Sequence, residues 1–359
     1  MTAPCIQSIE ARAVNVPLEF PVRTSVGIVD TAPLVLIDLK TNAGIVGRSY
    51  VFTYTPLALR ATLEMVRSLG SLLTGLPLAP ADLDALFSSR LRLIGKTGLN
   101  QIACAGLDMA VWDAHAQFLG RPLVEVLGGT RKPIPTYDSH SMDGIELGCQ
   151  RAERSAKAGF KAIKTKLGHA TLEEDIKMIR ALRNTVGPNI QILVDYNQGL
   201  TVPEAIRRIH VLEAEDLGWI EEPVIQENLR GYAEIRRRTR TPIQMGENWW
   251  GPGDMQNALE AGACDLAMPD AMKIGGVTGW MKAAALAQVY GIPMSSHVFE
   301  EFSAHLMLVT PTAHIFERMD LAGPILARSV QYENGHAVLD DTPGVGISWN
   351  ESAVQRYAA

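Results

Sequence analysis

Two lysines separated by one residue, Lys164 and Lys166, end a short apolar run bounded by Gly159 and Gly168. In a β-strand, side chains two residues apart point to the same face, so the two ammonium groups would lie side by side. Each charge lowers the pKa of the other, which could prepare one lysine as a general base near neutral pH. The alternative is a solvated strand edge, so the pair needs support from residues elsewhere in the chain.

Three carboxylates, Asp195, Glu221 and Glu247, end three successive apolar runs further along the chain. If these runs are adjacent parallel strands about 5 Å apart, the three side chains converge and repel one another. A hard divalent cation removes this repulsion, and carboxylate oxygens are ligands that Mg²⁺ prefers. The pattern predicts a magnesium site, with pairing to lysines as the alternative. Glu222 is adjacent to Glu221, and the pattern does not decide which of the two faces the metal.

An acidic residue and a histidine, Asp270 and His297, end two later apolar runs. A carboxylate beside an imidazole fixes the tautomer of the ring and stabilises its protonated form. His140 also follows an apolar run, but it has no predicted acidic neighbour. The pattern therefore singles out His297 as a candidate base, with a structural histidine as the alternative.

The polar residues that end these runs recur at intervals of about 20 to 31 residues, roughly the length of a strand, loop, helix and loop. Eight such units predict a (β/α)8, TIM-like barrel over residues 126–322, because active-site residues of these barrels lie at the carboxyl ends of the strands. The eight positions are Ser139, Lys164, Asp195, Glu221, Glu247, Asp270, His297 and Glu317.

In such a barrel, the strands that carry Lys166 and His297 stand on roughly opposite sides of the ring. Two bases flanking one carbon can exchange a proton at a stereocentre, because one removes the proton and the conjugate acid of the other returns one. The dianion formed alpha to a carboxylate needs strong electrostatic stabilisation. Mg²⁺, Lys164 and a protonated Glu317 could supply it, and Asn197 could bind a substrate hydroxyl.

Residues 1–125 predict an α+β domain. Strand patterns fill residues 5–52 except for an expected loop at 21–30, and helical patterns follow at residues 57–74, 80–93 and 98–119. The barrel repeat fades after Glu317. Residues 323–359 are too few for a further domain, so we expect this segment to pack back on the first one.

Composition and charge exclude several classes of function. The chain of 359 residues is 47% hydrophobic with a net charge of −6 and no basic patch, which argues against a nucleic-acid partner. No apolar run approaches the length of a membrane span, and no secretory signal pattern is present. The four cysteines are scattered, which fits a reducing compartment. We expect a soluble cytoplasmic protein.

Longer motifs resemble those of the enolase superfamily, and in particular of its mandelate racemase branch. They are Val194-Asp195-Tyr196-Asn197-Gln198, Met245-Gly246-Glu247-Asn248-Trp249, Met268-Pro269-Asp270-Ala271-Met272-Lys273 and Ser295-Ser296-His297. The resemblance implies an N-terminal α+β capping domain on a modified (β/α)7β barrel, whose eighth unit lacks a regular helix. It also implies the chemistry of this superfamily, in which a lysine or histidine base works with Mg²⁺, and a homo-oligomer.

The resemblance also implies roles for single residues. The three carboxylates described above would bind Mg²⁺, which favours Glu221 over Glu222. Lys166 would be the base for the (S)-enantiomer, and His297, supported by Asp270, the base for the (R)-enantiomer.

The substrate carboxylate would contact Lys164, Ser139 and Glu317, with Glu317 acting as an electrophilic acid, and Asn197 would bind the alpha-hydroxyl. In the muconate cycloisomerase-like branch a second lysine ends the sixth strand. Asp270 at that position argues against that branch.

The expected activity is racemisation of mandelate or a similar small aryl or vinyl 2-hydroxy acid. In this superfamily a loop of the capping domain closes over the substrate, and here the apolar residues Val22, Val26, Val29 and Tyr54 would form that cover. The alternatives are an acid-sugar dehydratase of the same superfamily, and a catalytically silent scaffold. Val298, Met319 and Lys96 depart from the residues expected around the substituent, so its identity stays open.

Overall fold

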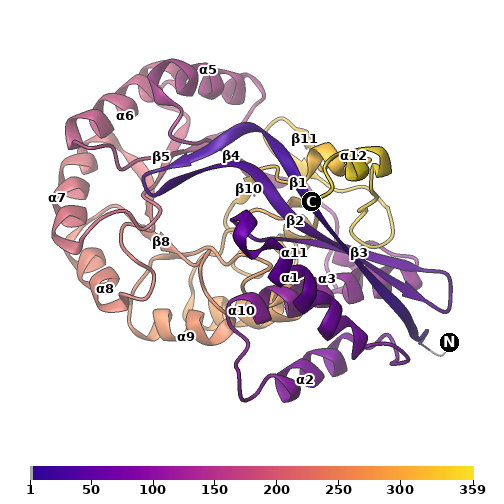
Figure 1. Ribbon diagram of the computed structural model, residues 1–359. Coiled ribbons are helices and arrows are strands. Elements are labelled where there is room, and N and C mark those ends of the chain that lie inside the picture. Colours follow the sequence, from indigo (N-terminus) through magenta and orange to yellow (C-terminus); the bar gives the residue numbers. More distant parts are fainter. Residues whose placement is uncertain (1–2) are drawn as a thin grey trace.

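The N-terminal part of the chain forms a capping unit beside the barrel (Figure 1). This computed structural model describes residues 3–359. Three strands form an antiparallel sheet in chain order: β1 (Ile6–Thr24), β2 (Gly27–Thr41) and β3 (Val46–Phe52). Three helices follow close to their predicted positions: α1 (Pro56–Ser71), α2 (Pro80–Arg90) and α3 (Leu99–Phe118).

The predicted loop at residues 21–30 is wrong, because this segment is the tip of a long β-hairpin. β1 and β2 stay paired as far as Thr24 and Gly27, which leaves Ser25 and Val26 as a two-residue turn. The Thr24 hydroxyl accepts hydrogen bonds from the amides of Val26 and Gly27, at 3.1 and 3.0 Å. A register shift in β1 between Pro17 and Val22 accommodates Pro21 within the strand. The hairpin crosses the barrel toward β5 (Figure 1).

The barrel consists of short parallel strands in chain order, and β10 pairs with β4 to close the ring. The strands are β4 (Ile134–Ser139), β5 (Ala162–Lys166), β6 (Gln191–Asp195), β7 (Leu217–Glu221), β8 (Ile243–Met245), β9 (Leu266–Ala267) and β10 (Phe316–Arg318). At the seventh position Met294 bridges Ala267 and Ala313 in place of a regular strand. The predicted fold class, a modified barrel with an N-terminal capping domain, is confirmed.

Helices surround the barrel strands on the outside (Figure 1). They are α5 (Gly144–Lys157), α6 (Leu172–Val186), α7 (Val202–Leu212), α8 (Leu229–Arg238), α9 (Pro252–Glu260), α10 (Gly276–Tyr290) and α11 (Glu300–Met307), with the short α4 (Leu123–Val126) ahead of the first strand. Thr171 and Thr201 cap α6 and α7 by accepting from the amides of Glu174 and Glu204. Such caps fix where the preceding loops end, and the loop before α7 carries Asn197.

Helix α3 of the capping unit docks on α10 of the barrel. Trp112 Nε1 donates to Thr278 Oγ1 at 2.9 Å, and the Thr278 amide donates to Asp108 Oδ2 at 3.0 Å. A Cβ at Gly276 would lie 2.3 Å from Asp108 Oδ2, so the close approach requires glycine there. Burial raises the pKa of Asp108 to about 7. This contact joins the two parts of the chain next to the barrel loops.

The C-terminal segment touches both the barrel and the capping unit. Its hairpin, β11 (Gln331–Glu333) and β12 (His336–Val338), pairs with the start of β4. Its last helix, α12 (Glu351–Arg356), lies against β1, where Glu351 pairs with Arg12 at 2.6 Å. Trp349 Nε1 also donates to Asp38 of β2 at 2.9 Å. The segment therefore links the first barrel strand to the capping sheet.

The expectations about membrane spans and cysteines concern residues 3–359. No helix in this range has both the length and the apolar character needed to cross a membrane. The four cysteines are free, and two of them, Cys104 and Cys264, are buried. Burial raises the pKa of each of these two thiols to about 12, so both are held as neutral, unreactive groups.

Candidate active site

Three carboxylates meet at the carboxyl ends of adjacent strands. Asp195 ends β6, Glu221 ends β7 and Glu247 follows β8, and one oxygen of each lies within 4.8 Å of the others. All three side chains are buried. Burial, reinforced by the other two carboxylates, raises the pKa of Glu221 to about 8 although Lys164 opposes the shift. Hard oxygen ligands in a buried cluster of like charge fit a hard dication such as Mg²⁺.

Glu221 belongs to this cluster, and Glu222 is turned away from it. Glu221 accepts from Trp219 Nε1 at 3.1 Å. Glu222 has a left-handed backbone with φ 38°. Its carboxylate accepts from Asn248 Nδ2 at 2.9 Å to each oxygen and from Gln198 Nε2 at 3.1 Å. β7 ends at Glu221, and the left-handed backbone of Glu222 turns its side chain in a different direction.

Lys164 and Lys166 are buried, which excludes a solvated strand edge. Lys164 Nζ lies 2.8 Å from Glu221 Oε1 and 2.8 Å from Glu317 Oε1. Lys166 Nζ pairs with Asp195 Oδ2 at 2.5 Å. Burial lowers the pKa of both lysines, but the facing carboxylates outweigh it and raise both pKa values.

The expectation that Lys164 gives Lys166 a lowered pKa is therefore wrong for this arrangement of charges. Lys164 does lower the pKa of Lys166, as predicted, but the adjacent Asp195 raises it by more. The prediction considered the two cations without the anions they face. The pKa of Lys166 also depends on whether a cation neutralises the carboxylates, because a bound cation becomes the largest local charge.

His297 forms the predicted pair with Asp270. Its Nδ1 lies 2.8 Å from Asp270 Oδ2, and its Nε2 lies 3.2 Å from Glu247 Oε2. Asp270 Oδ1 accepts from the amides of Met272 and Lys273 at 2.8 and 3.0 Å, which fixes the carboxylate. Burial opposes a charge on His297, but Glu247 and Asp270 outweigh it and raise its pKa to about 9. The ring is held in one orientation with Nε2 toward the carboxylate cluster.

Glu317 lies in β10 beside Lys164. Its Oε2 accepts from the Val298 amide at 2.9 Å, and its own amide donates to Ser296 Oγ at 2.9 Å. Burial raises the pKa of Glu317, but Lys164 and His297 outweigh burial and lower the pKa to about 2. Without substrate, the two cations that face this carboxylate favour its ionised form, and a protonated Glu317 beside a bound substrate carboxylate stays a prediction.

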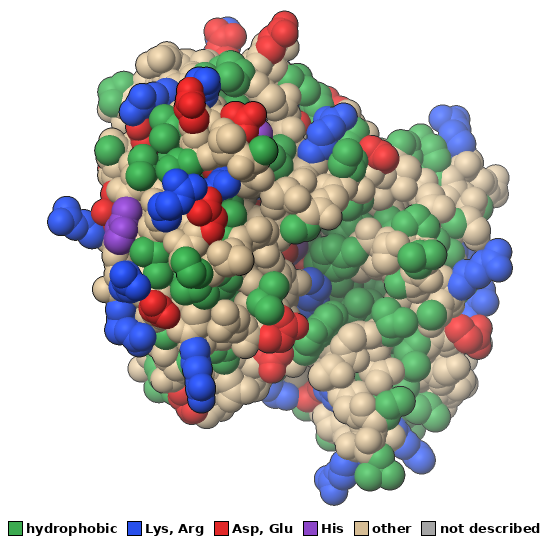
Figure 2. Space-filling view, turned by 60° about the vertical axis from the view of Figure 1, so that its left-hand side comes forward, with side chains coloured by type: hydrophobic (Ala, Val, Ile, Leu, Met, Phe, Trp, Pro, Cys, Tyr) green, Lys and Arg blue, Asp and Glu red, His purple; other side chains and the backbone are tan. Residues whose placement is uncertain are grey.

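One cavity of about 370 Å³ joins these groups to the β1–β2 hairpin. Among the predicted residues its lining holds Lys164, Lys166, Asn197, Glu247, His297, Val22, Val26, Val29 and Tyr54. Asn197 has φ 43°, and its buried Oδ1 has no hydrogen-bond partner among the described residues. Figure 2 shows a hollow between two lobes of the molecule, where hydrophobic side chains surround a blue basic side chain. The cavity has a charged floor and an apolar cover.

The cavity also contains a lysine that the strand-end pattern did not identify. Lys273 is 4% exposed, its Nζ donates to Asn248 Oδ1 at 2.5 Å and it lies 4.2 Å from the centre of the Tyr54 ring. No carboxylate lies within ion-pair distance of Lys273 among the described residues. Its place three residues after Asp270, beyond the strand, is why the periodic pattern missed it. The signal was available in the motif that contains Asp270.

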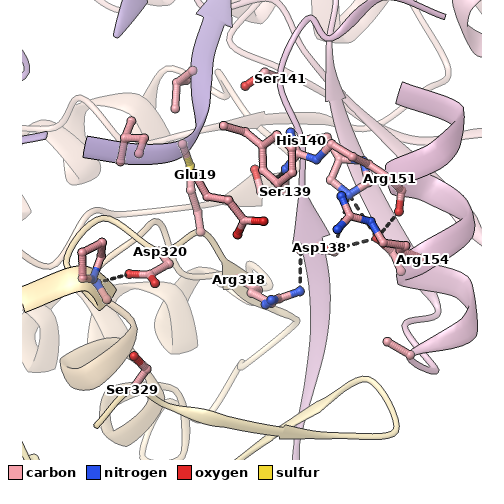
Figure 3. A pocket seen from close by; sticks show the side chains of 18 of the residues that line it. Glu19, Asp138, Ser139, His140, Ser141, Arg151, Arg154, Arg318, Asp320 and Ser329 are labelled. Carbon is pink, nitrogen blue, oxygen red and sulfur yellow. Dashed lines mark hydrogen bonds and ion pairs between the residues drawn. The ribbon is translucent and has the colours of Figure 1, made fainter. Parts of the chain in front are cut away.

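A larger cavity of about 560 Å³ lies next to the first and shares Val22 and Met319 with it. Ser139, predicted to meet the substrate carboxylate, lines this larger cavity (Figure 3), and its buried Oγ has no hydrogen-bond partner among the described residues. The other polar lining residues include Glu19, Asp138, His140, Arg151, Arg154, Arg318 and Asp320. Arg318 pairs with Asp138 at 3.3 Å, and Arg151 pairs with Asp143 at 2.6 Å. This cavity lacks the clustered carboxylates and the two candidate bases.

Comparisons with known proteins agree with this geometry. Residues 7–128 match the mandelate racemase/muconate lactonizing enzyme N-terminal domain, and residues 149–353 match the enolase C-terminal domain-like family. An enolase from Bradyrhizobium, solved with magnesium and mandelic acid, is 47% identical with a TM-score of 0.96, covering 100% of this chain and 99% of that chain. An enolase from the alphaproteobacterium bal199, solved with magnesium, is 38% identical with a TM-score of 0.96, covering 99% of this chain and 100% of that chain.

Curated relatives are more distant and differ in activity. D-galactarolactone cycloisomerase of Agrobacterium fabrum is 32% identical over 297 residues, which cover 76% of this chain and 78% of the relative. Others are an L-Ala-D/L-Glu epimerase of Clostridium acetobutylicum and an arabinonate dehydratase of Saccharolobus solfataricus, at 29% and 27% identity. Isomerases and dehydratases thus occur among the relatives of this chain.

Proposed function

The chain belongs to the mandelate racemase/muconate lactonizing enzyme family of the enolase superfamily, and we propose that it is a magnesium-dependent racemase of mandelate or a similar aryl or vinyl 2-hydroxy acid. One observation carries this proposal: the two candidate bases, Lys166 and His297, line the same cavity as Glu247 of the carboxylate cluster. The similarity to a structure solved with mandelic acid supports the substrate class.

Asp195, Glu221 and Glu247 would hold Mg²⁺, which supplies positive charge that makes the proton alpha to a bound carboxylate more acidic. Lys166 takes that proton from the (S)-enantiomer. His297, whose Nδ1 is held by Asp270 at 2.8 Å, presents Nε2 and returns a proton to the opposite face of the carbon. The roles are reversed for the (R)-enantiomer, as two-base exchange requires.

The polar end of the substrate would lie over the charged floor of the cavity. Lys164 is placed to pair with the substrate carboxylate, since it already contacts two carboxylates at 2.8 Å. A substrate carboxylate beside Glu317 would oppose its negative charge and so raise its pKa toward the protonated form. Asn197 would bind the alpha-hydroxyl through the Oδ1 that otherwise has no partner.

The substituent of the substrate would lie under the hairpin. Val22, Val29 and Tyr54 line the cavity, and Phe52 stacks on Tyr54 at a ring distance of 4.5 Å. Burying a phenyl ring in such surroundings contributes about 2 to 3 kcal/mol. The apolar cover therefore favours an aryl or vinyl group over a chain of hydroxyls.

A dehydratase of acid sugars is the second candidate. Lys273, Asn248 and Glu222 give one side of the cavity a polar lining, and an arabinonate dehydratase is among the relatives. Dehydration needs an acid that protonates a leaving hydroxyl, and Lys273 is the group best placed for that role. The three valines of the hairpin count against a polyhydroxylated substrate.

The test is to incubate one enantiomer of mandelate with the protein and Mg²⁺ and to follow optical rotation. We expect the rotation to decay to zero with no loss of mandelate. Persistent rotation, together with formation of a 2-keto acid from an acid sugar, would overturn the racemase proposal in favour of the dehydratase. The same assay after chelation should show no activity.

A further inference from the structure

The tip of the β1–β2 hairpin is fastened to the barrel by one side chain, Ser25. Its hydroxyl donates a 2.9 Å hydrogen bond to the carbonyl of Tyr196, in the loop after β6. The other hydrogen bonds between residues 21–30 and the described barrel use hairpin carbonyls, which accept from the loop after β4: Ser141 Oγ to Pro21 at 3.1 Å and Met142 N to Arg23 at 3.0 Å. The remainder of the tip is open to solvent, since Val26 in the turn and Ile28 in β2 are 68% and 61% exposed.

Two glycines from different barrel loops make room for Ser25. A Cβ at Gly199, after β6, would lie 2.4 Å from Ser25 Oγ, and a Cβ at Gly168, after β5, would lie 2.7 Å from Ser25 Cβ. Gly168 has φ +107°, so its backbone also requires glycine. Gly199 has no such conformation, and the approach of Ser25 and of the local Tyr196 carbonyl accounts for its glycine. Ser25 therefore occupies a fitted notch and not an open surface.

The turn whose Tyr196 carbonyl accepts from Ser25 contains Asn197, a residue of the proposed active site. Asn197 and Gln198 both have left-handed backbones, with φ 43° and 65°, a conformation that side chains other than glycine disfavour. The Tyr196 carbonyl accepts from the Gly199 amide at 3.0 Å as well as from Ser25. The bond from the Gly199 amide closes the turn around Asn197, and the bond from Ser25 holds the same carbonyl from the hairpin. The amide of Asn197 donates to Asp195 Oδ1 at 2.7 Å, so the turn is also tied to the carboxylate cluster.

We propose that Ser25 is a positioning residue that couples closure of the hairpin to the orientation of Asn197. When the hairpin is down, the Ser25 hydroxyl and the Gly199 amide hold the turn that aims Asn197 Oδ1 into the cavity. When the hairpin lifts, the turn loses one of these two hydrogen bonds. Recognition of the substrate alpha-hydroxyl then requires the closed hairpin. This inference rests on the proposed function, which assigns the alpha-hydroxyl to Asn197.

Binding of two substrate-like acids tests the coupling in the Mg²⁺-loaded protein. 2-Hydroxy-2-phenylpropanoate and 2-methyl-2-phenylpropanoate lack the reactive proton and differ only by a hydroxyl in place of a methyl group. We expect the wild type to prefer the hydroxy acid, and Ser25→Ala to reduce that preference about fivefold, the effect of one hydrogen bond. An equal loss of affinity for both acids, or no change for either, would overturn the proposal. Ser71→Ala, which removes a serine hydroxyl bonded within α1, is the matched control.

Amide hydrogen exchange tests the same coupling without any substrate. Ser25→Ala should speed exchange in both residues 22–29 and residues 196–199, because the two segments are held together. Faster exchange in the hairpin alone would contradict the coupling, even if the wild type binds both acids. If the wild type binds neither acid, the proposed function fails, while the exchange result still decides the inference.

Gly199→Ala gives a second, steric test. The added Cβ would push against Ser25 Oγ, so exchange in residues 22–29 should increase. Gly253→Ala is the control, since a Cβ there meets nothing within 4 Å. An increase no larger than that of Gly253→Ala would contradict the close fit of Ser25 against Gly199.

Discussion

The two adjacent cavities differ in how their charges are arranged, and the carboxylate cluster lies at the smaller one. In the cavity of about 560 Å³, buried charges are paired, as in Arg151 with Asp143, and the unpaired Arg154 is exposed to water. In the cavity of about 370 Å³, the floor brings together three buried carboxylates within 4.8 Å. Buried like charges that lie close together are therefore a better guide to a functional site than the size of a cavity, because such charges are costly unless a ligand stabilises them.

The largest expected effect is on activity in the smaller cavity. Glu247→Gln should lower racemisation of mandelate by about a thousandfold or more, because it removes a metal ligand and the charge beside His297. Mg²⁺ affinity, measured by calorimetry, should fall with it. Asp138→Asn in the larger cavity is the control, and activity there should stay within about threefold of wild type. Similar losses in both variants would remove the distinction between the cavities.

A substitution in the larger cavity should change stability and not activity. Arg151→Ala would leave Asp143 buried without its partner at 2.6 Å and remove the cation over the Phe20 ring at 4.3 Å. We expect a loss of about 3 kcal/mol in the free energy of unfolding, measured by denaturant titration. Activity of the folded variant should be nearly unchanged. A variant as stable as wild type but inactive would place Arg151 in the chemistry.

The smallest effect should have the opposite sign. In protein freed of Mg²⁺ by chelation, Glu221→Gln should raise the free energy of unfolding by about 1 kcal/mol, because it removes one of three buried like charges. Addition of Mg²⁺ should stabilise the wild type more than the variant, which differential scanning calorimetry can measure. A variant destabilised in the chelated protein would mean that the carboxylates are satisfied without a cation.

The barrel and most of the site residues could be predicted because both follow from local order along the chain. Strand-end residues repeat at the length of one βα unit, so Asp195, Glu221 and His297 could be placed on one edge before any distance was known. The hairpin at residues 21–30 could not be predicted, since Pro21 is accommodated by a register shift in β1 that depends on pairing with β2.

The charge states could not be predicted, for a different reason. Lys166 and Glu317 each face groups of opposite charge from other strands, so the direction of each pKa depends on distances across the barrel. Ser139 was correctly placed at the end of β4. The cavity that it lines could not be deduced, because that also depends on distances across the barrel. Lys273 lies past a strand end, where the periodic pattern carries no information.

The most direct test of the central claim is proton exchange by a His297→Asn variant in deuterated solvent. Folded, Mg²⁺-bound variant should still exchange the alpha-proton of (S)-mandelate through Lys166, while exchange of the (R)-enantiomer is lost, as nuclear magnetic resonance would show. Loss of exchange for both enantiomers, or retention of both, would contradict the assignment of one base to each face.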